Sequence, residues 1–295
     1  MLRSISPLIA LFALLTAAAV HPLNAQVRSA GQVKPPAQDK TPAAAKAPPQ
    51  EKAPAPPSKT PTAEQVAEAV IFAYGSRGVL DQIRRNGIER GRITRTTAEG
   101  RAEEATYERR FVRGADASKD KVRVDQKMPN MEYSLVYGDG RLWGIINGAS
   151  FTPRQDAVTS FMSQYWHSID TLLRYKENGS TPAYVDRVKL KGLDIYVIDV
   201  ADKEKRRTRY YISAKSLHVL WLEYEEAPDA GGPPVKYTRK FSDYRPIQNT
   251  LLSYRSVLLA DDKQVQETRI SSVTFGLKLE DALFQNPDAQ ASSNP

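Results

Sequence analysis

Short runs in which apolar and polar residues alternate cover most of the chain beyond residue 87. Alternation of period two, bounded by Gly, Asn, Asp and Pro, is typical of half-buried β-strands. The pattern predicts strands over residues 91–97, 105–113, 121–126, 132–137, 141–146, 184–190, 193–200, 208–213, 217–225, 235–244, 251–259 and 265–275. Strands that follow one another without helices between them favour antiparallel connections. About 11–12 such strands need a curled sheet or a barrel, because a flat open sheet of this size leaves long exposed edges.

Three other segments repeat their apolar residues at helical spacing. Thr62 before Ala63-Glu64-Gln65 is typical of a helix N-cap with an acidic first turn. A second, short helix is predicted over residues 76–85, and a third, continuous one over residues 155–176. The apolar face of the third helix is formed by Val158, Phe161, Met162, Tyr165, Trp166, Ile169, Leu172 and Leu173. The fold class is therefore mainly β with a few helices (α+β).

The ends of the chain differ in composition from this middle part. Residues 1–25 have the features of a secretory signal peptide, with Arg3, a 14-residue apolar run over residues 7–20 and a cleavage site near Ala25. Because about 20 residues are needed to cross a bilayer, an uncleaved anchor is the less favoured interpretation. Residues 26–61 contain nine prolines and eight alanines, which predicts a disordered linker. We expect a folded domain over residues 62–287 and a disordered tail over residues 288–295.

Much of the positive charge lies outside the predicted domain. The chain carries a formal net charge of +8, yet beyond Pro61 there are 35 Lys and Arg against 32 Asp and Glu. Tyrosines interleave with basic residues along the later strands, but tyrosine is common on any half-buried strand. Nucleic acid is therefore not an expected partner. The linker is interpreted as a spacer, with peripheral contact to anionic lipid headgroups as the weaker alternative.

Residues that commonly carry catalysis are scarce. The chain has no cysteine and three histidines, of which His21 lies in the predicted signal peptide. His167 and His218 are predicted to be structural, since each lies within an apolar helix or strand pattern. No metal, nucleotide or hydrolase motif is present, and Ser118–Lys121 matches S-x-x-K without the motifs that accompany it. We expect a non-enzymatic protein with no cofactor, no catalytic residues and no metal site.

Neighbouring carboxylates leave one enzymatic alternative open. Asp199 with Asp202, or Glu223 with Glu225 and Glu226, are candidates for the paired acids of a carboxylate-dependent envelope hydrolase. Such chemistry depends on the separation of the two acids across a cleft rather than along the chain. Solvated faces and turns are the favoured interpretation of both groups.

Several short segments along the domain resemble those of a known family. They are residues 91–93, 107–111, 121–125, 137–143, 210–213, 241–245 and 283–287. In this order, after the N-terminal helix pair, they resemble the LolA-like family of periplasmic outer-membrane lipoprotein-sorting and carrier proteins. The resemblance implies an unclosed antiparallel β-barrel wrapped over N-terminal and central helices, with a hydrophobic cavity for lipid or lipoprotein acyl chains. It also implies an arginine that latches a lid, for which Arg92, Arg95 and Arg109 are candidates.

A carrier of this kind shields acyl chains from water, since each buried methylene contributes about 0.8 kcal/mol. A barrel of more than about eight strands leaves room for such chains. The candidates to line the cavity are Val70, Phe72, Tyr107, Phe111, Tyr133, Trp143, Phe161, Met162, Trp166 and Trp221. The alternative is that these side chains fill the core.

The sequence thus predicts a periplasmic, monomeric binder of an acylated lipoprotein or lipid. As a carrier or receptor, it would exchange this ligand with inner- and outer-membrane transfer proteins. The alternative is an envelope sensor or interaction module that binds a protein partner and holds no internal lipid.

Overall fold

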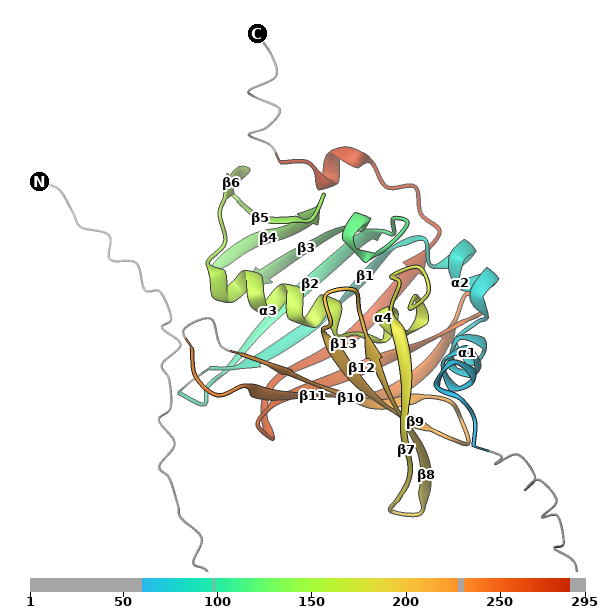
Figure 1. Cartoon of the computed structure of the whole chain (residues 1–295). Helices are drawn as coiled ribbons and strands as arrows, with labels where there is room; N and C mark the ends of the chain where they lie inside the picture. The colour runs from blue at the N-terminus through green and yellow to red at the C-terminus, as the bar shows by residue number, and fades with distance from the viewer. Residues whose placement is uncertain (1–59, 98, 228–230, 287–295) are drawn as a thin grey trace, which may run out of the picture. The chain divides into compact units, whose positions relative to one another are not determined.

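The computed structural model describes residues 60–97, 99–227 and 231–286 (Figure 1), and the predicted signal peptide, nearly all of the linker and the tail lie outside them. One antiparallel sheet of thirteen strands runs through this part, in the order β6-β5-β4-β3-β2-β1-β13-β12-β11-β10-β9-β8-β7. β6 and β7 form its two edges, so the sheet is unclosed. Strands β1–β6 form one half of the sheet and strands β7–β13 the other, each in chain order, and the two halves meet where β1 pairs with β13. The mainly β fold with an open antiparallel sheet is therefore confirmed.

The strands match the alternating pattern closely. They are β1 Asn86–Thr96, β2 Ala102–Val112, β3 Lys121–Met128, β4 Met131–Gly138, β5 Arg141–Ile146, β6 Ala149–Phe151, β7 Thr181–Leu190, β8 Leu193–Ala201, β9 Arg207–Ser213, β10 Val219–Glu226, β11 Val235–Ile247, β12 Thr250–Ala260 and β13 Lys263–Phe275. The sequence missed β6, because three residues are too few to show a period. Between β4 and β5, Asp139 and Gly140 have φ angles of 51° and 73°, the left-handed values that a tight hairpin turn requires.

The first two helices form as the sequence predicts. α1 spans Ala63–Ala73, and Thr62 caps it: its Oγ1 accepts from the Gln65 N–H at 3.2 Å, while the Gln65 Oε1 accepts from the Thr62 N–H at 2.9 Å. This reciprocal pair satisfies two of the N–H groups that a helix start leaves unpaired. α2 follows over Arg77–Ile83.

The prediction of one continuous helix over residues 155–176 is wrong. α3 ends at Trp166 (Gln155–Trp166), and a separate α4 spans Ile169–Leu173. Between them, the Ser168 Oγ accepts from the Thr171 N–H at 3.3 Å, and the Thr171 Oγ1 donates to the Trp166 carbonyl at 2.7 Å. These two side chains form hydrogen bonds with backbone groups that would be paired along the backbone of a continuous helix, so the helix is interrupted here. The helical spacing of the apolar residues nevertheless continues across the interruption.

The helices pack on one side of the sheet in two groups, which we call the first core and the second core. In the first core, α1 packs against β7, β8 and α4. Its buried members include Val70, Ile71, Leu172, Ile198, Tyr210, Ile212 and Leu222. The second core consists of Phe111, Val122, Tyr137, Val273 and Phe275, with Phe161, Met162 and Tyr165 of α3 packed against it. In Figure 1 the sheet curls around α3 and α4, while α1 lies toward its β7 end.

A hydroxyl network fixes the end of α1 to the sheet. The Tyr74 hydroxyl donates to the Tyr244 hydroxyl at 3.1 Å and accepts from the Val219 N–H at 3.2 Å. The Tyr244 hydroxyl in turn donates to the Val219 carbonyl at 2.5 Å. Tyr74 is 1% exposed, so water does not replace these partners. The network therefore joins α1 to β10 and β11 within the first core.

We expect Tyr74→Phe to lower the free energy of unfolding by about 1–3 kcal/mol, because it leaves the Val219 N–H buried without an acceptor. Urea unfolding followed by circular dichroism measures this change. Tyr133→Phe is the control, as no hydrogen bond of the Tyr133 hydroxyl is described, and we expect a change within about 0.5 kcal/mol. Equal effects of the two substitutions would contradict the role given to the Tyr74 hydroxyl.

Candidate functional site

Helix α3 covers the second core only loosely. All twelve residues of α3 lie within the described part of the chain, and Ser163 alone is buried. By contrast, α1 buries five of its eleven residues. The apolar side chains Phe161, Met162 and Tyr165 are half-buried, with the Tyr165 ring 5.3 Å from that of Tyr137. A helix whose apolar face stays partly accessible is suited to cover a space that another apolar group enters.

Polar contacts hold α3 near its C-terminal end. Gln164 accepts hydrogen bonds from Arg239 of β11 and from Gln266 of β13, the latter at 3.1 Å. The Tyr165 hydroxyl donates to Asp120 Oδ2 at 2.5 Å. At the other end, Arg154 gives no side-chain cap, and residues 154–157 are exposed. The hydrogen bonds described above, which join α3 to β11, β13 and Asp120, thus lie near its C-terminal end.

Beneath the helices lies a group of buried ionic side chains around Asp170 of α4. Arg84 donates to its Oδ1 at 3.0 Å, and an Arg113 nitrogen lies 2.7 Å from the same oxygen. Burial alone raises the pKa of Asp170, but Arg113, Arg84 and Arg109 outweigh it and hold this pKa well below its ordinary value. Asp170 is therefore a carboxylate at neutral pH.

A second acid, Glu89 of β1, lies on the same side of the sheet. The Tyr107 hydroxyl donates to its Oε1 at 2.7 Å, and Arg109 Nη1 lies 3.8 Å from its Oε2. Burial and the Glu89 charge both raise the pKa of Tyr107, so this hydroxyl stays protonated. The interior of the fold is consequently not purely apolar.

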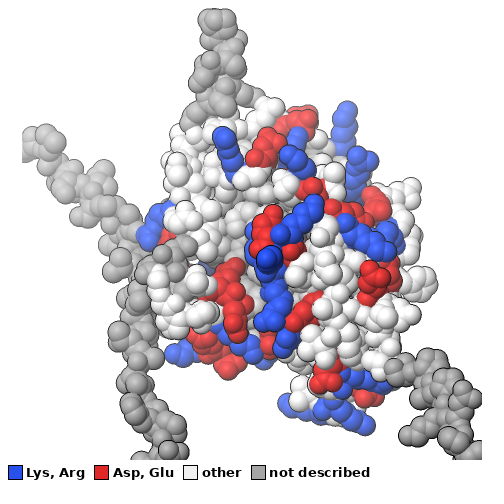
Figure 2. All heavy atoms as spheres, in the orientation of Figure 1, with Lys and Arg blue, Asp and Glu red and all other residues white. Residues whose placement is uncertain are grey.

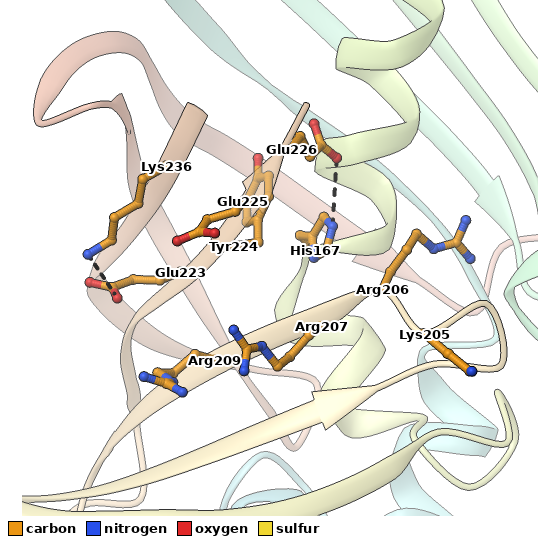
Figure 3. Close-up of a pocket in the computed structure, with 10 residues that line it drawn as sticks. All are labelled: His167, Lys205, Arg206, Arg207, Arg209, Glu223, Tyr224, Glu225, Glu226 and Lys236. Carbon is orange, nitrogen blue, oxygen red and sulfur yellow. Dashed lines mark ion pairs between the residues drawn. The ribbon is translucent and has the colours of Figure 1, made fainter. Parts of the chain in front are cut away.

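A charged hollow of about 330 Å³ opens where β9 and β10 separate (Figure 3). Their pairing ends at Glu223 opposite Arg209, whereas β10 continues to Glu226 alongside β11. The lining residues are His167, Lys205, Arg206, Arg207, Arg209, Glu223, Tyr224, Glu225, Glu226 and Lys236. In Figure 3, Lys236 and Glu223 form an ion pair on one side, while His167 and Glu226 approach each other beside α3.

His167 closes this gap from the helix side. Its Nδ1 lies 2.6 Å from Thr208 Oγ1 of β9, and its ring stacks on Tyr224 of β10 at 4.0 Å between centroids. The residue is 3% exposed. Burial lowers the pKa of His167 to about 4, with a further contribution from the Arg206 charge. The prediction that His167 is structural fits this packing, and the residue joins two strands that do not pair with each other here.

A second hollow of about 330 Å³ lies over β1, β2 and β3. Its lining includes Gly91, Tyr107, Glu108, Asp125, Gln126, Lys127 and Glu132. Gly91 is required there, since a Cβ would lie 2.8 Å from the Tyr107 ring and 2.3 Å from the Arg269 carbonyl oxygen. Neither hollow has the continuous apolar lining that the sequence predicts for a lipid cavity.

The predicted cavity residues do not form one surface. Phe111, Phe161 and Met162 meet at the second core, and Val70 lies in the first core. Tyr107 contacts Glu89, as described above. The remaining candidates are half-buried or exposed, and they are Phe72, Tyr133, Trp143, Trp166 and Trp221.

Three of these candidates lie away from the covered side of the sheet. Phe72 is 76% exposed, because it falls between the buried residues of α1. Trp221 alternates with the buried Leu222 and stacks on Tyr211 at 4.3 Å, so it faces the opposite side of the sheet. Trp143 pairs with Val136, which alternates with Tyr137 of the second core, and it faces the same opposite side.

Of the remaining pair, Tyr133 pairs with Gln126 and shares the side of Tyr137. Trp166, at the end of α3, lies under the Arg206 guanidinium at 4.3 Å. Both stay predictions as ligand contacts.

Of the three latch candidates, Arg109 alone is among the charges that act on Asp170 of α4. Arg92 is more than half exposed and pairs with Glu104 at 3.2 Å. Arg95 donates to Gln126 at 2.8 Å. Arg109 interacts with Glu89 and with Asp170 of α4, which together raise its pKa against the lowering effect of burial. Sequence reasoning missed Arg84, Arg113 and Asp170, because no spacing rule brings α2, β2 and α4 together.

Two of the candidate acids for hydrolysis, Asp199 and Asp202, are held by arginine side chains. Asp199 accepts from Arg209 at 2.7 and 2.9 Å, and Asp202 accepts from Arg206 at 2.6 Å. On the face shown in Figure 2, basic and acidic side chains lie next to one another rather than in separate patches. Within the described residues, no group of three or more His, Cys, Asp or Glu side chains could hold a metal ion. None of the described helices is long and apolar enough to span a membrane.

Comparison with known proteins identifies the fold. No family model and no curated protein matches the chain. A DUF1329 family protein from Desulfovibrio piger has a TM-score of 0.56 at 12% identity, covering 78% of this chain and 99% of that chain. A putative outer membrane lipoprotein-sorting protein domain from Vibrio parahaemolyticus has a TM-score of 0.54 at 13% identity, covering 74% and 97%. A LolA superfamily protein from Nitrosomonas europaea has a TM-score of 0.53 at 10% identity, covering 77% and 98%. The LolA-like fold is thereby confirmed.

We expect the protein to lose stability as the pH falls from about 6.5 to about 4, by up to about 3 kcal/mol through His167. The folded state disfavours the charged imidazole, so this contribution is complete above the unfolded pKa and is lost as protons bind. His167→Gln removes this part of the pH dependence, and His218→Gln keeps it. Urea midpoints between pH 4 and 7.5 measure the effect. A wild-type midpoint that stays constant over this range would contradict it.

Proposed function

We propose that the chain is a periplasmic, non-enzymatic carrier or receptor for the acyl chains of lipids or lipoproteins. The observation that carries the proposal is the loose cover of the second core by α3. The LolA-like fold supports it, since one of its structural neighbours is a putative outer membrane lipoprotein-sorting protein domain. The predicted signal peptide supports export to the periplasm.

In this proposal, acyl chains take the place that α3 side chains now hold. Phe161 and Met162 pack against the second core but remain half-buried. If α3 tilts outward about its anchored C-terminal end, these side chains leave the second core and an acyl chain covers it instead. Each buried methylene contributes about 0.8 kcal/mol, so a chain of moderate length compensates for the lost helix contacts. The carrier then has no need of a permanent apolar cavity.

The charged hollow at β9 and β10 favours the alternative function. There the ends of two neighbouring strands do not pair with each other, and basic and acidic side chains surround the gap. A partner protein with an extended, charged segment could add backbone hydrogen bonds at such a gap. On this alternative the protein is an envelope sensor or interaction module without internal lipid.

Native mass spectrometry of protein purified from the periplasm tests the carrier function. We expect co-purified acylated lipid that organic extraction removes. Phe161→Asp should reduce the retained lipid about tenfold, because a charge on the apolar face of α3 opposes burial against acyl chains. Leu193→Asp is the control, since Leu193 is 52% exposed at the tip of the β7–β8 hairpin. Wild-type protein that is free of lipid and takes up none from mixed vesicles would contradict the carrier function.

A further inference from the structure

Seven ionic side chains lie together at the boundary between the two cores. Asp170 lies on α4 two residues before Leu172 of the first core, and the Arg84 guanidinium lies 5.4 Å from the Phe275 ring of the second core. The members of this interior group are Arg84, Arg109, Arg113, Arg174, Glu89, Asp120 and Asp170. They come from the end of α2, from β1, from β2 and the residues after it, and from α4 and the turn after it.

Within the group, Arg174 and Asp120 form an ion pair whose charges balance each other. Arg174 donates to Asp120 Oδ2 at 2.7 Å and to the Gly114 carbonyl at 2.9 Å. The Tyr165 hydroxyl also donates to Asp120. The remaining members are three arginines against two carboxylates, so this group holds one positive charge in excess.

The excess is visible at Arg84, which is only 4% exposed. One of its nitrogens, Nη2, donates to Asp170, while its Nε and Nη1 have no hydrogen-bond partner among the described residues. Burial lowers the pKa of the Arg84 guanidinium, and Asp170, although it acts in the opposite direction, does not restore it. A buried cation with unpaired N–H groups is unfavourable unless an anion compensates for it.

Two members of this group are not fully buried. The side chains of Arg109 and Asp170 keep 25% and 29% of their surface accessible. Tyr165 of α3 interacts with Arg109, which places α3 next to the same group.

We propose that Arg84, Arg109 and Arg113 bind an anionic headgroup, either a carboxylate or a phosphate, so that the ligand is an anionic amphiphile. Its acyl chain lies against the second core beneath α3, and its head compensates for the excess interior charge. This inference rests on the proposed carrier function and specifies its ligand class. Guanidinium groups suit the head because they donate in pairs to carboxylate and phosphate oxygens.

Calorimetric titration of the delipidated full chain with matched ligands tests the inference. The probes are laurate, its uncharged methyl ester with the same chain, and inorganic phosphate alone. We expect laurate to bind at least tenfold more tightly than methyl laurate, as charge-assisted hydrogen bonds are worth at least that factor. We also expect laurate to raise the melting temperature more than the ester at equal concentration.

A matched pair of variants locates the effect. Arg109 and Arg110 are neighbours on β2, face opposite sides of the sheet and have equal side-chain exposure, 25% each. Arg109→Gln should reduce the preference for laurate about tenfold, whereas Arg110→Gln should leave it unchanged. The wild-type comparison of acid and ester stands by itself if a variant fails to fold.

The outcomes distinguish a failure of the headgroup inference from a failure of the carrier function. Equal affinity for laurate and its ester overturns the headgroup inference and leaves the carrier function in place. A laurate preference that Arg109→Gln does not alter also overturns the inference. Binding of inorganic phosphate without either lipid, lost in Arg109→Gln, supports the anion site and contradicts the carrier function. Absence of binding by all three probes overturns both.

Discussion

A single curled sheet has to be covered on its inner side by very few helical residues, and this constraint organises the molecule. α1 and α4 cover the β7–β10 part with buried side chains, and the Tyr74 network fixes the end of α1 there. α3 covers the remaining part, from β13 and β1 to β4, with half-buried side chains and with polar contacts near its C-terminal end. The first core is thus the more deeply buried of the two, and in the proposed function the second core is the part that opens.

The interior ionic group also affects how the helices are placed on the sheet. Buried arginines are costly because they lose hydration, and pairing with carboxylates offsets only part of that cost. A fold selected for stability alone would fill this boundary with apolar side chains of similar volume. Here Asp170 of α4 accepts from Arg84 at the end of α2, and an Arg113 nitrogen after β2 lies 2.7 Å from the same oxygen, so the ionic group also sets how the helices sit on the sheet. Specific placement and a polar interior thus come from the same residues.

The break between α3 and α4 connects these features. A helix that continued through residue 168 would join α3, which covers the second core, rigidly to α4, which packs in the first core. The turn at His167 and Ser168 instead separates α3 from α4 and directs His167 toward β9 and β10. As a result the gap between these strands is closed by a side chain of the helical layer.

The sequence by itself determined every strand except β6, the cap at Thr62, the hairpin at Asp139-Gly140 and the antiparallel connections, because period-two alternation and turn residues act locally. That the sheet is unclosed was implied only by the family resemblance. The sequence also placed Phe111, Phe161 and Met162 on apolar faces that meet. It could not show that α3 and α4 are separate, since His167 at the break contacts Thr208 and Tyr224, which come from strands distant in the sequence. Which arginines face inward was likewise decided by the tertiary structure. The alternation along β2 puts Arg109 and Arg110 on opposite sides, but only the packing of α2 and α4 shows that Arg84, Arg113 and Asp170 converge there, because ionic contacts between distant segments leave no periodic trace in the chain.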